Sequence, residues 1–202
     1  GIFNYSVSTS GCSVQTFYGQ IISQSGNITL ASSTASANQS FCLGNPLSPI
    51  KYTISTTSGA PVITGLPTGL STSFVSGILI ISGTPTQTGV FNYSVSVSSG
   101  SCNTGLIQNG SLTVNELPLV SISIDSCIIP GRYLLQAVPS PAAAYTYLWS
   151  TGATSDTVSV RSSGNYSVVI TNSNGCKANA QVAVSIGLAL TSVTGLSLIH
   201  IS

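Results

Sequence analysis

Residues 64–97 read TGLPTGLSTSFVSGILIISGTPTQTGVFNYSVSV, and this stretch decides the fold. Two short runs within it, 70–75 and 78–82, are separated by Ser-Gly alone. A two-residue loop that contains glycine supplies the positive φ that a tight β-hairpin needs. From 89 to 97, apolar side chains alternate with Asn and Ser, which is the period of a strand with one buried and one wet face. The stretch therefore predicts antiparallel β-structure.

The rest of the chain shows the same short alternating runs, interrupted by Gly, Pro, Asn and Ser turns. Short strands with turn signals roughly every 8–12 residues favour a β-sandwich over a βαβ fold. No window shows the sustained period of 3.6 residues that an amphipathic helix requires. The expected strands are 1–8, 26–30, 50–56, 62–64, 70–75, 78–82, 89–97, 110–114, 120–124, 133–138, 145–149, 157–160, 166–171 and 178–186.

An internal repeat divides the chain into modules. The first eight residues, GIFNYSVS, return 88 residues later as GVFNYSVS, with a single difference. Tandem repetition of this kind indicates modules that each fold around their own core. The expected division is the C-terminal part of a truncated module at 1–30, a linker at 31–38, a complete module at 39–115, a linker at 116–118, a further module at 119–187 and a tail at 188–202.

Side chains on the inward period of the longest runs are the expected core residues. In the module at 39–115 these are Phe91, Tyr93 and Val95, and in the module at 119–187 they are Trp149, Tyr166 and Val168.

Charge is scarce throughout the sequence. Four Lys and Arg residues stand against three Asp and Glu residues, for a net charge of +1. Binding to nucleic acid depends on neutralising phosphates with basic side chains, so nucleic acid is a poor partner. Apolar residues alternate with hydroxyl residues almost everywhere, so no run of 18 or more apolar residues predicts a membrane span.

Residues for catalysis are also few. His200 is the only histidine and lies in the tail, so the modules cannot form a Ser–His or Cys–His nucleophile pair. Asp125 and Asp156 are the only acidic residues inside the expected modules, and their Ser and Thr neighbours indicate turn roles. Two Asp and one Glu over 202 residues are also too few to favour a calcium site. We therefore expect no enzymatic activity, no metal and no cofactor.

Two stretches resemble known bacterial repeats. The run LPTGLSTSFVSGILIISGTPTQTGVFNYSVSV resembles the immunoglobulin-like repeats of large bacterial surface proteins. The runs YLWSTGAT at 147–154, GNYSV at 164–168 and NGC at 174–176 resemble the PKD-type or gliding-adhesin repeats of Bacteroidetes. The PKD pattern Asp-Phe-Gly-Asp after the tryptophan is replaced here by Ser-Thr-Gly, so no role of those carboxylates carries over.

The resemblance implies tandem immunoglobulin-like antiparallel β-sandwiches, the last of them PKD-like, in a secreted protein of the bacterial cell surface. These repeats share no catalytic residues. The implied function is a non-catalytic adhesin stalk, with surface glycans, other cell-surface proteins and neighbouring modules of the same chain as partners. The alternative is a spacer or carbohydrate-binding accessory of a secreted polysaccharide-degrading enzyme.

Two features admit a functional interpretation beside a structural one. Trp149 and Tyr147 fall on one face of an expected strand and could form a platform for sugar stacking, but a lone Trp in such a strand more often packs in the core. Thr157 lies in Asp-Thr-Val, a short pattern associated with O-glycosylation in Bacteroidetes, and a plain turn explains it as well.

Five cysteines are an odd number for a secreted protein. Modules that fold separately should keep their bridges within one module, which pairs Cys42 with Cys102 and Cys127 with Cys176. Cys12 is then a free thiol. The competing account is five reduced, buried cysteines in a cytosolic protein.

The last eight residues, GLSLIHIS at 195–202, resemble a translated sequencing-adapter fragment. The alternative is the first strand of a further module.

Overall fold

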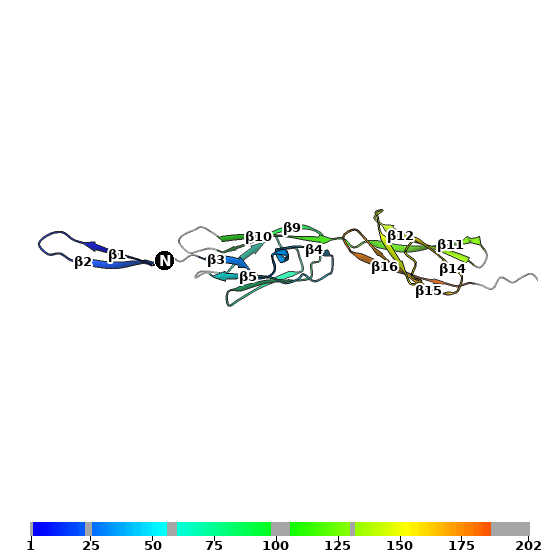
Figure 1. Cartoon of the computed structure of the whole chain (residues 1–202), viewed down its shortest axis with the longest axis horizontal. Helices are drawn as coiled ribbons and strands as arrows, with labels where there is room; N and C mark the ends of the chain where they lie inside the picture. Colours follow the sequence, from blue (N-terminus) through cyan, green and yellow to red (C-terminus); the bar gives the residue numbers. More distant parts are fainter. Residues whose placement is uncertain (1, 23–25, 56–59, 98–105, 130–131, 187–202) are drawn as a thin grey trace, which may run out of the picture. The chain divides into compact units, whose positions relative to one another are not determined.

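The computed structural model describes residues 2–22, 26–55, 60–97, 106–129 and 132–186. The chain divides into two compact units, unit 1 at Gly1–Glu116 and unit 2 at Leu117–Ser202. The described residues form sixteen strands and one short 3₁₀ turn, with no α-helix, so the protein is all-β (Figure 1). The strands are β1 (Ile2–Ser8), β2 (Thr16–Ile22), β3 (Asn27–Leu30), β4 (Asn38–Cys42), β5 (Ile50–Ser55), β6 (Val62–Thr64), β7 (Leu70–Val75), β8 (Ile78–Gly83), β9 (Gly89–Val97), β10 (Leu106–Asn115), β11 (Leu119–Ile129), β12 (Arg132–Ser140), β13 (Thr146–Trp149), β14 (Thr157–Val160), β15 (Gly164–Thr171) and β16 (Lys177–Val184).

Unit 1 contains a sandwich of two four-stranded sheets, ordered β4-β10-β9-β6 and β3-β5-β8-β7. The burial of β5 alternates strictly, and that of the second half of β9 does the same, so each strand turns one face inward. The core between the sheets consists of Ile28, Leu47, Ile50, Tyr52, Ile54, Leu79, Ile81, Tyr93, Val95, Val97 and Leu112.

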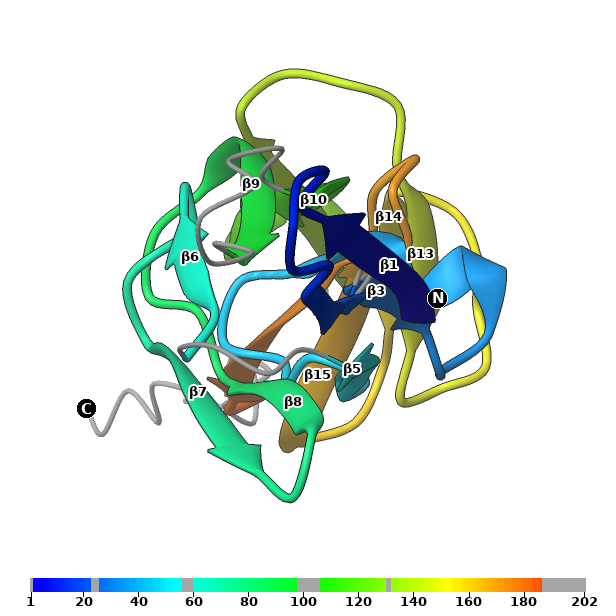
Figure 2. The same cartoon turned by 90° about the vertical axis from the view of Figure 1, so that its left-hand side faces the viewer.

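The hairpin expected from residues 64–97 is present as β7 and β8 (Figure 2). Both loop residues have positive φ, 49° at Ser76 and 77° at Gly77. Positive φ at both positions is the geometry of a type I′ turn, whose twist matches that of the flanking strands.

The expected module boundary before residue 39 is wrong. β3 pairs with β5, so residues 27–30 belong to the sandwich and not to the preceding repeat. The expected linker at 31–38 contains a 3₁₀ turn, Thr34–Ala37, in which Ser36 and Ala37 are buried, followed by the first residue of β4. Small residues such as Ala and Ser fit under a neighbouring strand, and this allows a segment with the composition of a linker to pack.

One strand pair departs from the expected antiparallel arrangement. β4 runs parallel to β10, from Asn38 opposite Ser111 to Cys42 opposite Asn115. The remaining pairs in both units are antiparallel over the described residues.

Strands β1 and β2 form a two-stranded sheet of their own, and among the described strands β1 pairs with β2 alone. The sequence repeat was expected to pair residues 1–8 with a strand at 26–30. The structure shows that β2 takes this place, as β10 does beside β9.

Unit 2 is a sandwich of two three-stranded sheets, ordered β11-β12-β14 and β13-β15-β16. Its strands begin and end within a few residues of the expected positions, except that β11 continues to Ile129. The core consists of Leu135, Ala137, Trp149, Val160, Val168, Ile170 and Val184.

The expected core residues are mostly buried. Tyr93 and Val95 are buried in unit 1, and Trp149 and Val168 in unit 2. Phe91 and Tyr166 are only half-buried, because each packs against the margin of its core.

Candidate binding surface

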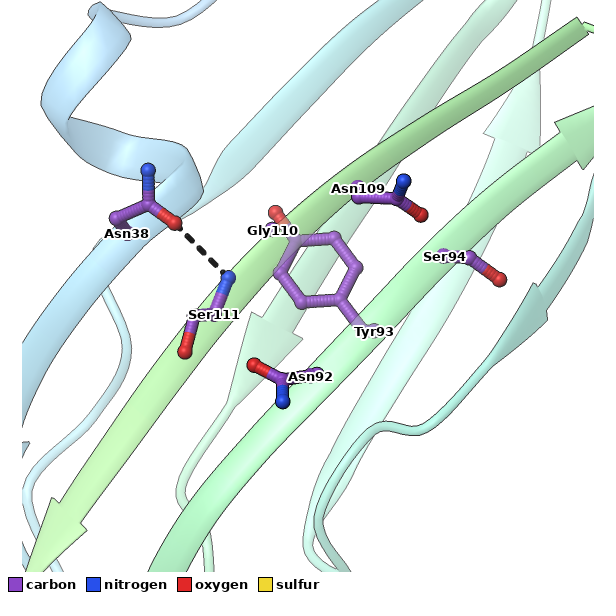
Figure 3. Close-up of a pocket in the computed structure, with 7 residues that line it drawn as sticks. All are labelled: Asn38, Asn92, Tyr93, Ser94, Asn109, Gly110 and Ser111. Atoms are coloured by element: carbon purple, nitrogen blue, oxygen red, sulfur yellow. Dashed lines mark hydrogen bonds between the residues drawn. The ribbon is translucent and has the colours of Figure 1, made fainter.

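A hollow of about 370 Å³ lies where β4 begins beside β10 and β9 (Figure 3). Its lining comes from three strands and is uncharged. The residues are Asn38, Asn92, Tyr93, Ser94, Asn109, Gly110 and Ser111.

The start of β4 creates the hollow. Asn38 is the first residue of β4, and its Oδ1 accepts a hydrogen bond from the Ser111 backbone N at 3.0 Å. β4 pairs with β10 only from Ser111 onward, so in the described sheet no strand lies along this edge at Asn109 and Gly110. The 3₁₀ turn Thr34–Ala37 lies beside this edge instead, with the Ala37 carbonyl oxygen close to Gly110.

Gly110 and Tyr93 form the inner wall of the hollow. They lie directly opposite each other on β10 and β9, and the Tyr93 ring extends across the position that a Gly110 side chain would occupy (Figure 3). A glycine inside a strand often marks such a close approach. The glycine is therefore required by packing.

The Tyr93 hydroxyl is held in place by two hydrogen bonds in the interior of unit 1. It lies 2.9 Å from the Tyr52 hydroxyl and donates to the Ala37 carbonyl oxygen at 3.3 Å. Burial, then the hydrogen bond to Tyr52 and its charge, raises the pKa of Tyr93 well above its ordinary value. Tyr93 is therefore neutral at physiological pH, and its hydrogen bonds to Tyr52 and Ala37 rigidify the sheet behind the hollow.

The raised Tyr93 pKa predicts a loss of stability in alkali. The pKa of Tyr93 is higher in the folded state than in the unfolded state. Its contribution to the stability of folded unit 1 is therefore fully present below about pH 10 and is lost as the pH rises above that value. We expect the free energy of unfolding of unit 1 to fall with a slope approaching about 1.4 kcal/mol per pH unit above pH 10. Urea unfolding between pH 7 and 11.5 measures this slope. In Tyr93→Phe this slope should decrease by about 1.4 kcal/mol per pH unit, the contribution of one proton. An unchanged slope contradicts the raised pKa of Tyr93.

The chemistry available in the hollow is hydrogen bonding. Two cross-strand pairs, Asn109 with Ser94 and Ser111 with Asn92, present amide and hydroxyl groups on the outer face of β9 and β10. Such groups act as both donors and acceptors and carry no charge. This arrangement suits a neutral polar ligand and offers no general acid or base at neutral pH.

Sequence reasoning did not identify this hollow. Asn and Ser in a β-rich sequence read as ordinary solvent-facing residues. The one available signal was Gly110 in the interior of an alternating run.

Trp149 and Tyr147 on β13 do not form an exposed aromatic platform for sugar stacking. Trp149 is only 2% exposed, and its Nε1 donates to the Ser155 carbonyl oxygen at 2.9 Å. Tyr147 is half-buried against the core of unit 2. An indole enclosed by the core cannot stack on a sugar, so the core interpretation of Trp149 holds.

The two acidic residues of unit 2 lie beside opposite edges of β12. Asp125 lies opposite Leu134, and the Asp156 carbonyl accepts from the Ala137 N on the other side of β12. With strands about 4.8 Å apart and a rise of about 3.3 Å per residue, their Cα atoms are roughly 14 Å apart. Asp125 also lies within β11, so the expected turn role is wrong for it, whereas Asp156 lies in the bend before β14.

Two further sequence hypotheses concern modification and metal binding. Thr157 begins β14 and is half-buried, and its carbonyl accepts a hydrogen bond from the Ser155 hydroxyl at 2.5 Å. O-glycosylation of Thr157 stays a prediction. Over the described ranges, no three His, Cys, Asp or Glu side chains cluster to hold a metal ion. His200 and the stretch 195–202 lie outside the described residues.

The cysteines fall into two classes. Cys42 and Cys176 are buried and disulfide-bonded, whereas Cys12 is an exposed free thiol. Cys102 lies outside the described residues, and of Cys127 only the backbone position in β11 is described. The structure therefore does not test the expected bridges, Cys42–Cys102 and Cys127–Cys176, directly.

The strand register weighs against the first bridge. Cys42 lies opposite Asn115, the last residue of β10, whereas Cys102 precedes Leu106, its first residue. β10 spans about 30 Å, and the four residues from Cys102 to Leu106 reach at most about 14 Å. Bridged Cα atoms lie within about 7 Å of each other. The part of the β10 length that this reach does not cover is longer than the Cα–Cα distance of a disulfide, so the register does not favour the bridge Cys42–Cys102.

The register also weighs against the second bridge. The Tyr133 hydroxyl donates to the Ser185 carbonyl at 3.4 Å, so β16 ends beside the start of β12, where β11 passes through Asp125. Cys176 precedes β16 at its other end, roughly 25 Å away. Cys127 and Cys176 therefore lie toward opposite ends of unit 2.

We expect peptide mapping without reduction to show Cys12 alkylated and neither of these two bridges. The peptides of Cys42 and Cys176 should be alkylated only after reduction, because both sulfurs are bonded. A peptide that joins Cys42 to Cys102, or Cys127 to Cys176, contradicts the register argument.

No family model and no curated protein matches this sequence. Solved structures do match. The C-terminal 282-residue fragment of intimin, in complex with the intimin-binding domain of its translocated receptor, is 17% identical over 67% of this chain, with a TM-score of 0.43. This chain covers 57% of that fragment.

Two further neighbours are 12% identical over 78% of this chain. Fibronectin(III)-like modules of Clostridium thermocellum CbhA are covered to 92%, with a TM-score of 0.35. Yersinia pseudotuberculosis adhesin InvE is covered to 58%, with a TM-score of 0.34. No helix in the described ranges is long and apolar enough to cross a membrane. The structural neighbours of this all-β chain are immunoglobulin-like and fibronectin-type domains.

Proposed function

We propose that this chain is a non-catalytic structural and adhesive segment of a large secreted bacterial cell-surface protein. The observation that carries the proposal is the hollow beside Tyr93, a rigid and uncharged set of hydrogen-bonding groups on the outside of the unit 1 sandwich. The resemblance of the sequence to bacterial surface repeats, with a PKD-like module in unit 2, supports the cellular setting. The disulfide-bonded Cys42 and Cys176 favour an oxidising, extracellular location.

The structural part of the proposal follows from the two cores. Each unit buries its own cluster of aliphatic and aromatic side chains, so each can remain folded as one element of a series. Surfaces of Ser, Thr and Asn keep such a series soluble with few charges.

The adhesive part follows from the chemistry of the hollow. Amide and hydroxyl groups at Asn92, Asn109 and Ser111 match the hydroxyls of a neutral glycan or the backbone of a peptide. A charged partner finds no counter-ion there. We assign neutral surface glycans as the partner, because their hydroxyls both donate and accept, as the lining groups do.

The alternative is a spacer or carbohydrate-binding accessory of a polysaccharide-degrading enzyme. It uses the same hollow for the same ligand class and differs in what the rest of the protein contains. The full-length reading frame distinguishes the two, because a hydrolase domain in it supports the alternative.

A glycan array tests the adhesive role on the full chain. We expect weak retention of neutral oligosaccharides, reduced at least fivefold in Asn92→Ala/Asn109→Ala. The matched control, Asn165→Ala/Asn179→Ala, removes two exposed strand asparagines from unit 2 and should bind as the parent does. No retention by the parent reduces the segment to a spacer. Release of sugar products from any polysaccharide overturns the non-catalytic assignment.

A further inference from the structure

The hairpin β1–β2 presents an uncovered apolar face. Five large apolar side chains share this face, and each is at least 50% exposed: Phe3, Tyr5, Val7, Phe17 and Ile21. The opposite face carries mostly polar groups, including Asn4, Ser6, Ser8, Thr16 and Gln20. Hydrophobic side chains gathered on one face of a sheet normally pack against a second layer.

The repeat identifies this face, because β1–β2 is a second copy of β9–β10. β1 and β9 share the sequence FNYSVS, and each is followed by an antiparallel partner. The cross-strand pairs agree. Phe3 lies opposite Ile21 as Phe91 lies opposite Leu112, and Tyr5 lies opposite Gly19 as Tyr93 lies opposite Gly110.

The agreement extends to side-chain packing. A Cβ added at Gly19 would overlap the Tyr5 ring, just as one at Gly110 would overlap Tyr93. A hollow of about 360 Å³ surrounds Gly19, lined by Asn4, Tyr5, Tyr18, Gly19 and Gln20, at the positions equivalent to the hollow around Gly110. The hairpin therefore has the local geometry of its counterpart without its covering sheet.

Unit 1 shows what covers that face in the counterpart. Tyr93 is 1% exposed because the sheet β3-β5-β8-β7 packs over it, with Ile50, Tyr52, Leu79 and Ile81 in the shared core. The Tyr52 hydroxyl completes the contact through its hydrogen bond to Tyr93. Tyr5, the equivalent of Tyr93, is 50% exposed.

We infer that the apolar face of β1–β2 is a docking surface for a β-sheet with the side chains of β3-β5-β8-β7. The occupant presents an uncharged aliphatic face with a tyrosine at the position of Tyr52, and it converts the hairpin into half of a sandwich like that in unit 1. The face holds no charged side chain, so an occupant with a charged surface does not match it.

A duplication tests this inference in the full chain. Residues 26–88 are placed a second time directly before Gly1, where they lead into GIFNYSVS as the native copy leads into GVFNYSVS. The added copy has no β9–β10 of its own, so both copies of this segment are completed at once only if one of them packs on the hairpin. We expect amide exchange in residues 2–22 to slow by at least 100-fold relative to the parent, and the added copy to be protected with it.

The matched control carries Ile81→Asp in the added copy only. A charge at this core position should abolish the protection of residues 2–22 and leave the native unit 1 unchanged. Fast exchange of residues 2–22 in the duplicated chain overturns the inference, as does an added copy that remains unprotected. Protection of residues 2–22 in the parent that increases with concentration also overturns it, because a second copy of the hairpin is then the occupant.

Discussion

In Trp149→Ala we expect unit 2 to lose about 3–5 kcal/mol of unfolding free energy, the usual range for removing a large aromatic side chain from a core. Trp149 is 2% exposed and contributes the largest fully buried side chain of the protein. The substitution also removes the donor to the Ser155 carbonyl. Since domains are stable by about 5–15 kcal/mol, this loss removes a large share of the stability of unit 2. Hydrogen exchange at increasing urea, read on peptides from each unit, measures the loss.

Leu148→Ala is the matched control for Trp149→Ala. Leu148 is the preceding residue of β13 but is 56% exposed, since successive strand residues face opposite sides. Its truncation should change the free energy by less than about 1 kcal/mol. Peptides of unit 1 should be unaffected by either variant, because its core contains no residue of unit 2. A loss below about 1 kcal/mol in Trp149→Ala contradicts the assignment of Trp149 as the centre of the core.

The sequence was sufficient to predict the fold because alternation is a local signal. The alternation of a strand is complete within the four residues of Thr157–Val160, and the hairpin is signalled by Ser-Gly between two short runs. The structure has strands at both places. Trp149 was expected in the core because a lone Trp in a strand of such a sandwich is usually buried, and it is buried in the structure.

The missed elements depend on contacts distant in sequence. β2 has one Gly and one Gln at its centre, which interrupt its apolar alternation, and its pairing is visible only beside β1. The segment 31–38 has the composition of a linker, and it packs because Ala37 accepts a hydrogen bond from Tyr93, 56 residues later. Composition alone does not carry this information.

The hollow was beyond sequence reasoning for a related physical cause. Asn38 and Asn109 are 71 positions apart, and they meet only because β4 runs parallel to β10 and begins opposite Ser111. Parallel pairing has no local sequence signal in a segment of five residues. Gly110 alone could have been singled out, as a glycine within a strand.

Gly110→Ala should destabilise unit 1 by about 2–6 kcal/mol. A methyl group at this position would overlap the ring and hydroxyl of Tyr93 and come within 2.5 Å of the Ala37 carbonyl oxygen. Overpacking of a core costs about 1–3 kcal/mol. If Tyr93 moves, its hydroxyl also loses Tyr52, and an unsatisfied buried hydroxyl costs about 1–3 kcal/mol more. Urea unfolding of unit 1 measures the sum.

A double-mutant cycle separates this clash from the general effect of alanine in a strand. In Tyr93→Leu the ring is absent, so adding Gly110→Ala should cost at least about 1 kcal/mol less than in the parent. Gly164→Ala is the control in unit 2, because its Cβ would meet only Tyr166 at an ordinary 3.8 Å. That variant should be nearly neutral. Equal losses from Gly110→Ala with and without Tyr93 would show that the ring does not require the glycine, and would remove the physical basis for the wall of the hollow.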